Sequence, residues 1–221
     1  MNIGDLARQW IVANFTVMVA TAAFGLLGFG IRYSLDLDSA DAALSAKICY
    51  VAAEIIMAAA SLALYAQLTG AVLRQIVPAF PRRNWLALHL VIGLVIGAGQ
   101  GGLLAGPGGD SEPIDWNDTA FLLFMFVVVP IGGAALGAVV GGLQALMLRR
   151  VAHGLGAWIA FSALATSVTL AIVVGAFPFS PLGPTFAAEI AMQGVTVLAG
   201  VVNAIVMLPA LRRLRPRTAE G

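Results

Sequence analysis

The sequence is poor in charged residues and contains a single cysteine. Of its 221 residues, 12 are Lys or Arg and 11 are Asp or Glu, so 10% are charged, against about 25% in soluble domains. The net charge of +1 and the lack of a long basic run argue against a nucleic-acid-binding protein, because phosphates are bound by clustered Lys and Arg. Cys49 has no second cysteine to pair with, which excludes a scaffold held by internal disulfides.

Apolar residues take the place of the missing charge. They make up 60% of the chain, and the mean hydropathy is +0.95. A water-soluble fold of this length could not bury so much apolar surface. Six apolar stretches reach about 20 residues, the length of a bilayer-spanning helix, and the strict alternation of a β-barrel is missing. We therefore predict an all-α polytopic membrane helix bundle, a single domain over 1–221. The predicted spans are 10–31, 48–77, 85–105, 119–148, 158–177 and 186–211.

The basic residues collect on one side of these spans. Arg32 and Lys47 fall on the other side, together with seven acidic residues. Because short cytoplasmic loops are enriched in Lys and Arg, we predict an inner (plasma) membrane protein with both termini in the cytoplasm. Small residues at 20–22 make a cleaved signal the alternative for the first span, but the apolar run continues to Ile31, which favours an uncleaved anchor. The basic side holds Arg8, Arg74, Arg82, Arg83, Arg149, Arg150, Arg212, Arg213, Arg215 and Arg217.

Three tryptophans at the start of the odd-numbered spans suggest an internal repeat. Trp10, Trp85 and Trp158 recur at nearly equal spacing, and each even-numbered span returns to an arginine. The pattern Ala-Ala-Glu-Ile-x-Met also links 52–57 with 187–192. Two interpretations stay open. The chain contains three hairpin repeats over 8–80, 82–151 and 156–217, or it shows the ordinary preference of Trp and Arg for membrane interfaces.

A short stretch in the second hairpin resembles a known group of proteins. The run Gly-Gly-Leu-Gln at 141–144 is followed by Leu-Arg-Arg at 148–150 and then by Trp158. This order is similar to the G-L-x-Q, L-R-R, W pattern in successive hairpins of small multi-pass bacterial membrane proteins of unknown function, although Gln144 here follows Leu143 directly. The resemblance implies a bacterial multi-pass membrane protein and brings no activity or site residues with it.

Two glutamates, Glu54 and Glu189, lie inside the predicted spans at matching positions of the shared pattern. An ionisable side chain is costly in a membrane span and by default indicates a functional site. A carboxylate pair facing one cavity could bind a cation, take up a proton or neutralise a cationic solute. Each glutamate also lies near the outer end of its span, where the helix dipole or the nearby Arg32 and Lys47 would stabilise it, so a structural role is the alternative.

The last span continues inward from its glutamate with a polar stripe. Gln193, Thr196 and Asn203 follow at helical spacing and, with the two glutamates, form our candidate site for a solute or ion. For Gln100, Gln144 and Asn203 we favour hydrogen bonds between helices over contact with a solute.

Glycines at every fourth residue of the fourth span predict a close helix contact. Gly133, Gly137 and Gly141 share one face, so a neighbouring helix can approach them backbone to backbone.

Two functions from different classes fit these features. The first is a small transport-type or solute-binding membrane protein with a carboxylate-lined cavity, and the second is a non-catalytic structural or accessory subunit of a membrane complex. We favour the first, because polar stripes on all six spans exceed what packing requires. Catalytic and metal-binding motifs are missing, so we predict no enzyme activity, no cofactor and no metal site. The expected partners are the lipid bilayer and, in addition, other membrane subunits or further copies of the chain, with no nucleic acid.

Overall fold

The computed structural model describes residues 3–37, 42–104, 119–176 and 186–217 and shows an all-α bundle. Within these residues, six helical segments are long and apolar enough to cross a membrane. The prediction of six spans in a multi-pass membrane bundle is confirmed, while the predicted span ends at residues 105 and 177 lie outside the described residues. The segments are α1 (Ile3–Ser34), α2 (Leu44–Ile76), α3 (Arg82–Leu104), the fourth span Thr119–Leu148, α6 (Leu155–Ala176), and the last span Phe186–Arg213, which comprises α7 (Phe186–Val206) and α8 (Leu208–Arg213).

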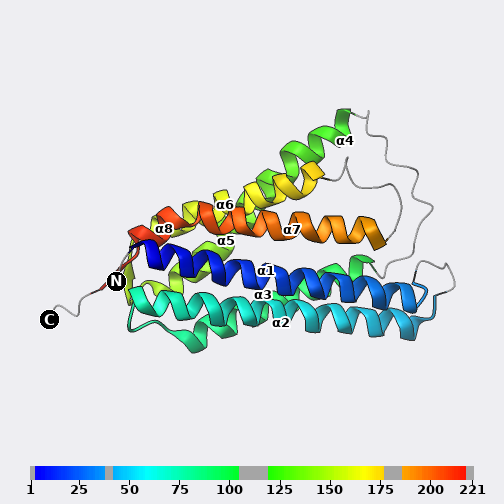
Figure 1. Ribbon diagram of the computed structural model, residues 1–221, viewed down its shortest axis with the longest axis horizontal. Coiled ribbons are helices and arrows are strands. Elements are labelled where there is room, and N and C mark those ends of the chain that lie inside the picture. The colour runs from blue at the N-terminus through cyan, green and yellow to red at the C-terminus, as the bar shows by residue number, and fades with distance from the viewer. Residues whose placement is uncertain (1–2, 38–41, 105–118, 177–185, 218–221) are drawn as a thin grey trace.

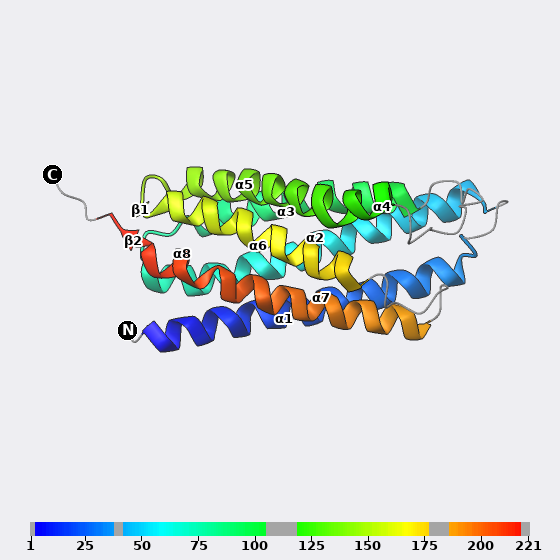
Figure 2. The ribbon, with the colours of Figure 1, turned by 90° about the horizontal axis from the view of Figure 1, so that it is seen from above.

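The first and the last described residues lie at the same end of the bundle (Figure 1). We call this the terminal end, where α1 begins and α8 ends, and we call the opposite end the far end. The helices form a ring in which α1 lies between α2 and α7, α2 packs on α3, and α6 packs on the fourth span and on α7. Seen from above, α1 and α7 run side by side along one edge of the bundle (Figure 2). The ring closes between α3 and the fourth span with far less contact.

The fourth span changes its helical pitch next to a proline. It consists of α4 (Thr119–Leu123), the π-helical turn η1 (Phe124–Val128) and α5 (Val129–Leu148), and Pro130 lies in the first turn of α5. Proline lacks a backbone N–H and its ring crowds the carbonyl four residues earlier. A wider π-helical turn before it accommodates both constraints.

A short strand pair ties the chain's last described residues to the turn after α5. Strand β1 (Ala152–His153) pairs antiparallel with β2 (Arg215–Pro216), with Ala152 opposite Pro216. The backbone N–H of Arg217 also donates to the carbonyl oxygen of Val151 at 2.9 Å. Gly154, at φ 84°, turns the chain from β1 into α6, a conformation that favours glycine.

The large buried side chains gather at the terminal end. Trp10, Trp85 and Trp158 are 1%, 0% and 0% exposed, and their rings meet edge to face, with Trp158 6.1 Å from Trp10 and 6.3 Å from Trp85. Leucines from α2, α5 and α8, among them Leu73 and Leu148, complete this core. The three tryptophans therefore pack inside the bundle, and their preference for the membrane interface stays an open interpretation. The hairpin repeat stays a prediction.

A buried hydrogen-bond chain joins three helices within this core. The indole Nε1–H of Trp158 donates to Oε1 of Gln144 at 2.8 Å, and Nε2 of Gln144 lies 3.1 Å from Nε2 of His89. The other ring nitrogen of His89 lies 2.7 Å from the backbone oxygen of Trp85. Gln144 thus links α5 to both α3 and α6, and its side chain makes the bonds between helices that the sequence favours.

Glycines set the spacing of the two closest helix pairs. Gly133, Gly137 and Gly141 of α5 are buried, and a methyl group at Gly137 would lie 2.6 Å from Oγ1 of Thr166 in α6. On α3, a methyl group at Gly97 would lie 2.6 Å from Cα of Ile55 in α2. Both helix pairs are held at a separation that excludes a Cβ at these positions.

Candidate functional site

A cavity of about 560 Å³ lies in the far half of the bundle. Such a volume falls in the range of about 300–1,000 Å³ that is usual for pockets binding small molecules. The terminal end, by contrast, is filled by the main core of buried side chains. The cavity and this core therefore lie at opposite ends of the bundle. The lining residues are Thr21, Phe24, Gly25, Phe29, Arg32, Tyr50, Glu54, Met57, Ser61, Gln100, Glu189, Gln193 and Thr196.

Four helices form the cavity wall. The second half of α1 and the first halves of α2 and α7 supply most of the lining, and Gln100 comes from the end of α3. Along α2 the lining runs from Tyr50 to Ser61, which at about 1.5 Å per residue gives a depth of roughly 16 Å. Thr21 and Ser61 therefore lie deepest, towards the terminal end.

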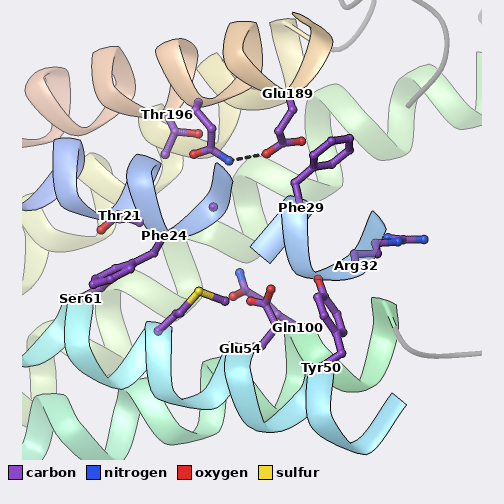
Figure 3. A pocket seen from close by; sticks show the side chains of 13 residues that line it. Thr21, Phe24, Phe29, Arg32, Tyr50, Glu54, Ser61, Gln100, Glu189 and Thr196 are labelled. Atoms are coloured by element: carbon purple, nitrogen blue, oxygen red, sulfur yellow. Dashed lines mark hydrogen bonds between the residues drawn. The ribbon is translucent and has the colours of Figure 1, made fainter. Parts of the chain in front are cut away.

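The two glutamates face this cavity from opposite sides. Glu54 extends from α2 and Glu189 from α7, with Gln100 on the side of Glu54 (Figure 3). Nε2 of Gln193, one helical turn further along α7, donates to Oε1 of Glu189 at 2.6 Å. This bond holds the Glu189 carboxylate against its own helix and leaves its second oxygen for other partners.

Two glycines of α1 make room for these polar groups. A methyl group at Gly28 would lie 2.6 Å from Oε1 of Glu54, and one at Gly25 would collide with the side-chain amide of Gln193. Because α1 lies between α2 and α7, its glycines let both side chains reach the same space from either side. The sequence alone does not indicate what these two glycines accommodate.

The rest of the lining is mainly aromatic and hydroxylic. The rings of Phe24, Phe29 and Tyr50 border the cavity, and the Tyr50 hydroxyl points into it (Figure 3). Arg32 belongs to the lining at its far end, but its side chain extends away from both glutamates (Figure 3). The space between the two carboxylates is thus acidic, polar and edged by aromatic rings.

The structure brings four of the five candidate residues together. Glu54, Glu189, Gln193 and Thr196 all line the cavity. Asn203 is not among the lining residues, and its Nδ2 donates to Oγ1 of Thr169 in α6 at 3.1 Å. Its contact is therefore the hydrogen bond between helices that the sequence analysis favours for it.

Several lining residues were missed because their types carry no signal on their own. Phe24, Phe29, Met57 and Ser61 are ordinary in an apolar span, and only the rotation of each helix turns them inwards. Tyr50, four residues before Glu54, lies on the same face of α2, so helical spacing alone could have identified it.

No protein-family model, no curated protein and no solved structure matches the chain.

Proposed function

We propose that the chain is a small transport-type or solute-binding protein of the bacterial inner membrane, with its solute held in the cavity between Glu54 and Glu189. The observation that carries this proposal is the convergence of these two carboxylates, from α2 and α7, on one cavity. Ionisable groups in membrane spans are costly, and they commonly line the paths of ions and solutes. A purely structural pair would not require a cavity between its members.

The proposal includes an orientation. The ten arginines named above are all exposed and belong to segments at the terminal end. Because Lys and Arg are enriched in cytoplasmic loops, we assign the terminal end to the cytoplasm and the cavity to the outer half of the membrane. The acidic residues 38, 41, 110, 112, 115 and 118, which support the same orientation, lie outside the described residues.

An accessory subunit is the weaker proposal. It draws its support from glycine faces that could receive a partner helix. In α5, however, Gly133, Gly137 and Gly141 already face α6 of the same chain. These glycines therefore explain the chain's own packing and need no external partner.

A cysteine-accessibility experiment tests whether the cavity is open to water from the outer side. In a Cys49→Ser background, Thr196→Cys places a thiol in the cavity, and Ala204→Cys places one on the same helix in the buried core. We expect a membrane-impermeant thiol reagent added to intact cells to label Thr196→Cys and to leave Ala204→Cys unlabelled. Equal labelling of the two variants, or no labelling of either, would contradict the proposal.

An uptake experiment tests the transport part. Cells that express the chain are screened with a panel of radiolabelled amines, amino acids and sugars. We expect at least one solute to accumulate, and we expect Glu189→Gln at equal expression to abolish that uptake. Full uptake in the Glu54→Gln/Glu189→Gln double variant would remove the assigned role of the carboxylates.

A further inference from the structure

We propose that the solute of this cavity is an organic ammonium ion, held between the carboxylates of Glu54 and Glu189 and against the rings of Phe29 and Tyr50. This inference rests on the function proposed above and narrows it to one class of solute. It follows from the charge of the cavity, the placement of its two carboxylates on opposite walls and its aromatic edge, which together fit an organic cation better than an anion, a neutral solute or a metal ion.

The charge of the cavity favours a cation. Arg32 is the only basic residue among the described lining residues, and its side chain extends away from Glu54 and Glu189 (Figure 3). An anion would be repelled by the two carboxylates. A neutral solute would displace water from both carboxylates without supplying a counter-charge, which is costly. A cation in this cavity supplies positive charge near both carboxylates, since both line the same space.

The placement of the two carboxylates on opposite walls disfavours a bare metal ion (Figure 3). Calcium takes about six to eight oxygen ligands at roughly 2.3–2.6 Å, so its ligands must converge on a point. Here the carboxylates stand on opposite walls of a space of about 560 Å³, and one oxygen of Glu189 is already bonded to Gln193. Within the described ranges there is also no group of three or more His, Cys, Asp or Glu side chains that could hold a metal.

The aromatic edge favours an alkylated ammonium group. A cation within about 6 Å of an aromatic ring centre is attracted to the ring face, and the effect grows as water is excluded. Phe29 provides such a ring beside Glu189 and Tyr50 provides one beside Glu54, while Phe24 borders the deeper part of the cavity near Ser61 (Figure 3). Met57 adds a soft, polarisable wall. These groups contact the carbon atoms of an organic cation, which a small inorganic ion does not have.

An isosteric pair of probes tests the proposal on the intact chain purified in detergent. Choline carries a quaternary ammonium, and 3,3-dimethyl-1-butanol has the same shape with carbon in place of the charged nitrogen. We expect isothermal titration to show choline binding at least about tenfold tighter than the alcohol, since a charge-assisted contact contributes this much. Glu54→Gln and Glu189→Gln should each weaken choline binding by about tenfold or more and leave the alcohol unchanged.

Two further variants test whether the loss of choline binding is specific to the cavity. They distinguish it from a general effect of negative charge and from misfolding. Asp36→Asn removes a negative charge at the far end but outside the lining, and asparagine tolerates the positive φ of 47° at this position. We expect it to keep full choline affinity. Phe29→Leu keeps both carboxylates and should weaken choline binding severalfold without affecting the alcohol. Size-exclusion chromatography identifies any variant that fails to fold.

The outcomes distinguish this inference from the proposed function. Equal affinity for choline and the alcohol, or tighter binding of sodium or calcium than of choline, overturns the ammonium assignment and leaves a solute cavity in place. Loss of choline binding in Asp36→Asn equal to that in Glu189→Gln overturns it as well. If the thiol at position 196 also stays unlabelled and no solute is taken up, the proposed function fails together with it.

Discussion

Two glycines of α3 offer a matched test of the helix packing behind the site. Gly97 is buried against α2, and a methyl group there would lie 2.6 Å from Cα of Ile55 and 2.8 Å from the backbone oxygen of Glu54. Gly99 lies on the opposite side of α3, and a methyl group there would meet nothing within 4 Å. Gly97→Ala and Gly99→Ala therefore make the same chemical change in two environments.

The cost of the Gly97 substitution follows from these distances. Carbon atoms pack at about 3.5–4.0 Å, so α3 and α2 must separate by roughly 1 Å to admit the methyl group. The atoms in contact belong to the backbone of α2 and cannot rotate away. Overpacking of this kind costs about 1–3 kcal/mol, whereas the gain in helix propensity is shared by both variants and cancels between them.

Unfolding by SDS in mixed micelles, followed by helical circular dichroism, measures this difference. We expect Gly97→Ala to unfold at lower SDS than the wild type, with a free energy of unfolding about 1–3 kcal/mol below that of Gly99→Ala. Gly99→Ala should match or exceed the wild type. Equal stability of the two variants would refute the close α2–α3 contact and, with it, the position of Glu54.

Three further predictions concern the cavity and the core. Gly28→Ala presses on the flexible ends of Glu54 and Met57, so we expect near-normal SDS stability and weaker choline binding by titration; unchanged affinity would contradict the proposed site. Gly137→Leu should separate α5 from α6 and lower both detergent stability and the yield of monodisperse protein. Wild-type values in both measurements would contradict the close contact between α5 and α6. Gln144→Leu leaves the buried indole N–H of Trp158 without its acceptor and should cost about 1–3 kcal/mol; a thermal midpoint equal to that of the wild type would contradict this.

The number and order of the spans could be predicted from the sequence because the bilayer imposes the length of each apolar run. The helix ends could not, since a helix continues past the hydrocarbon wherever its residues allow it. The first apolar stretch begins at Trp10, but α1 begins at Ile3 and carries Asp5 and Arg8 in its first turns. Polar residues at a helix end are solvated and do not stop the backbone ladder.

The candidate site was predictable only in part, for a related reason. An ionisable side chain in a membrane span is rare because its free-energy cost is high, so Glu54 and Glu189 could be identified without any structure. The rotation of each helix about its axis depends on the neighbouring helices in the ring. Those neighbours are distant in the sequence, so the residues of one span do not reveal which of its faces turns inwards. For this reason Asn203 was grouped with the glutamates although it bonds to Thr169, and Phe24 was overlooked although it lines the cavity.

The tryptophan core makes intrinsic fluorescence a probe of the terminal end of the molecule. Three of the four tryptophans lie in it, at the end away from the cavity, and the fourth, Trp116, lies outside the described residues. A solute that simply fills the cavity leaves the surroundings of these three indoles dry, so their emission should stay at short wavelength. A transport cycle that opens the terminal end must admit water to them and shift the emission to the red. Intrinsic fluorescence during uptake therefore separates a carrier from a receptor without any added label.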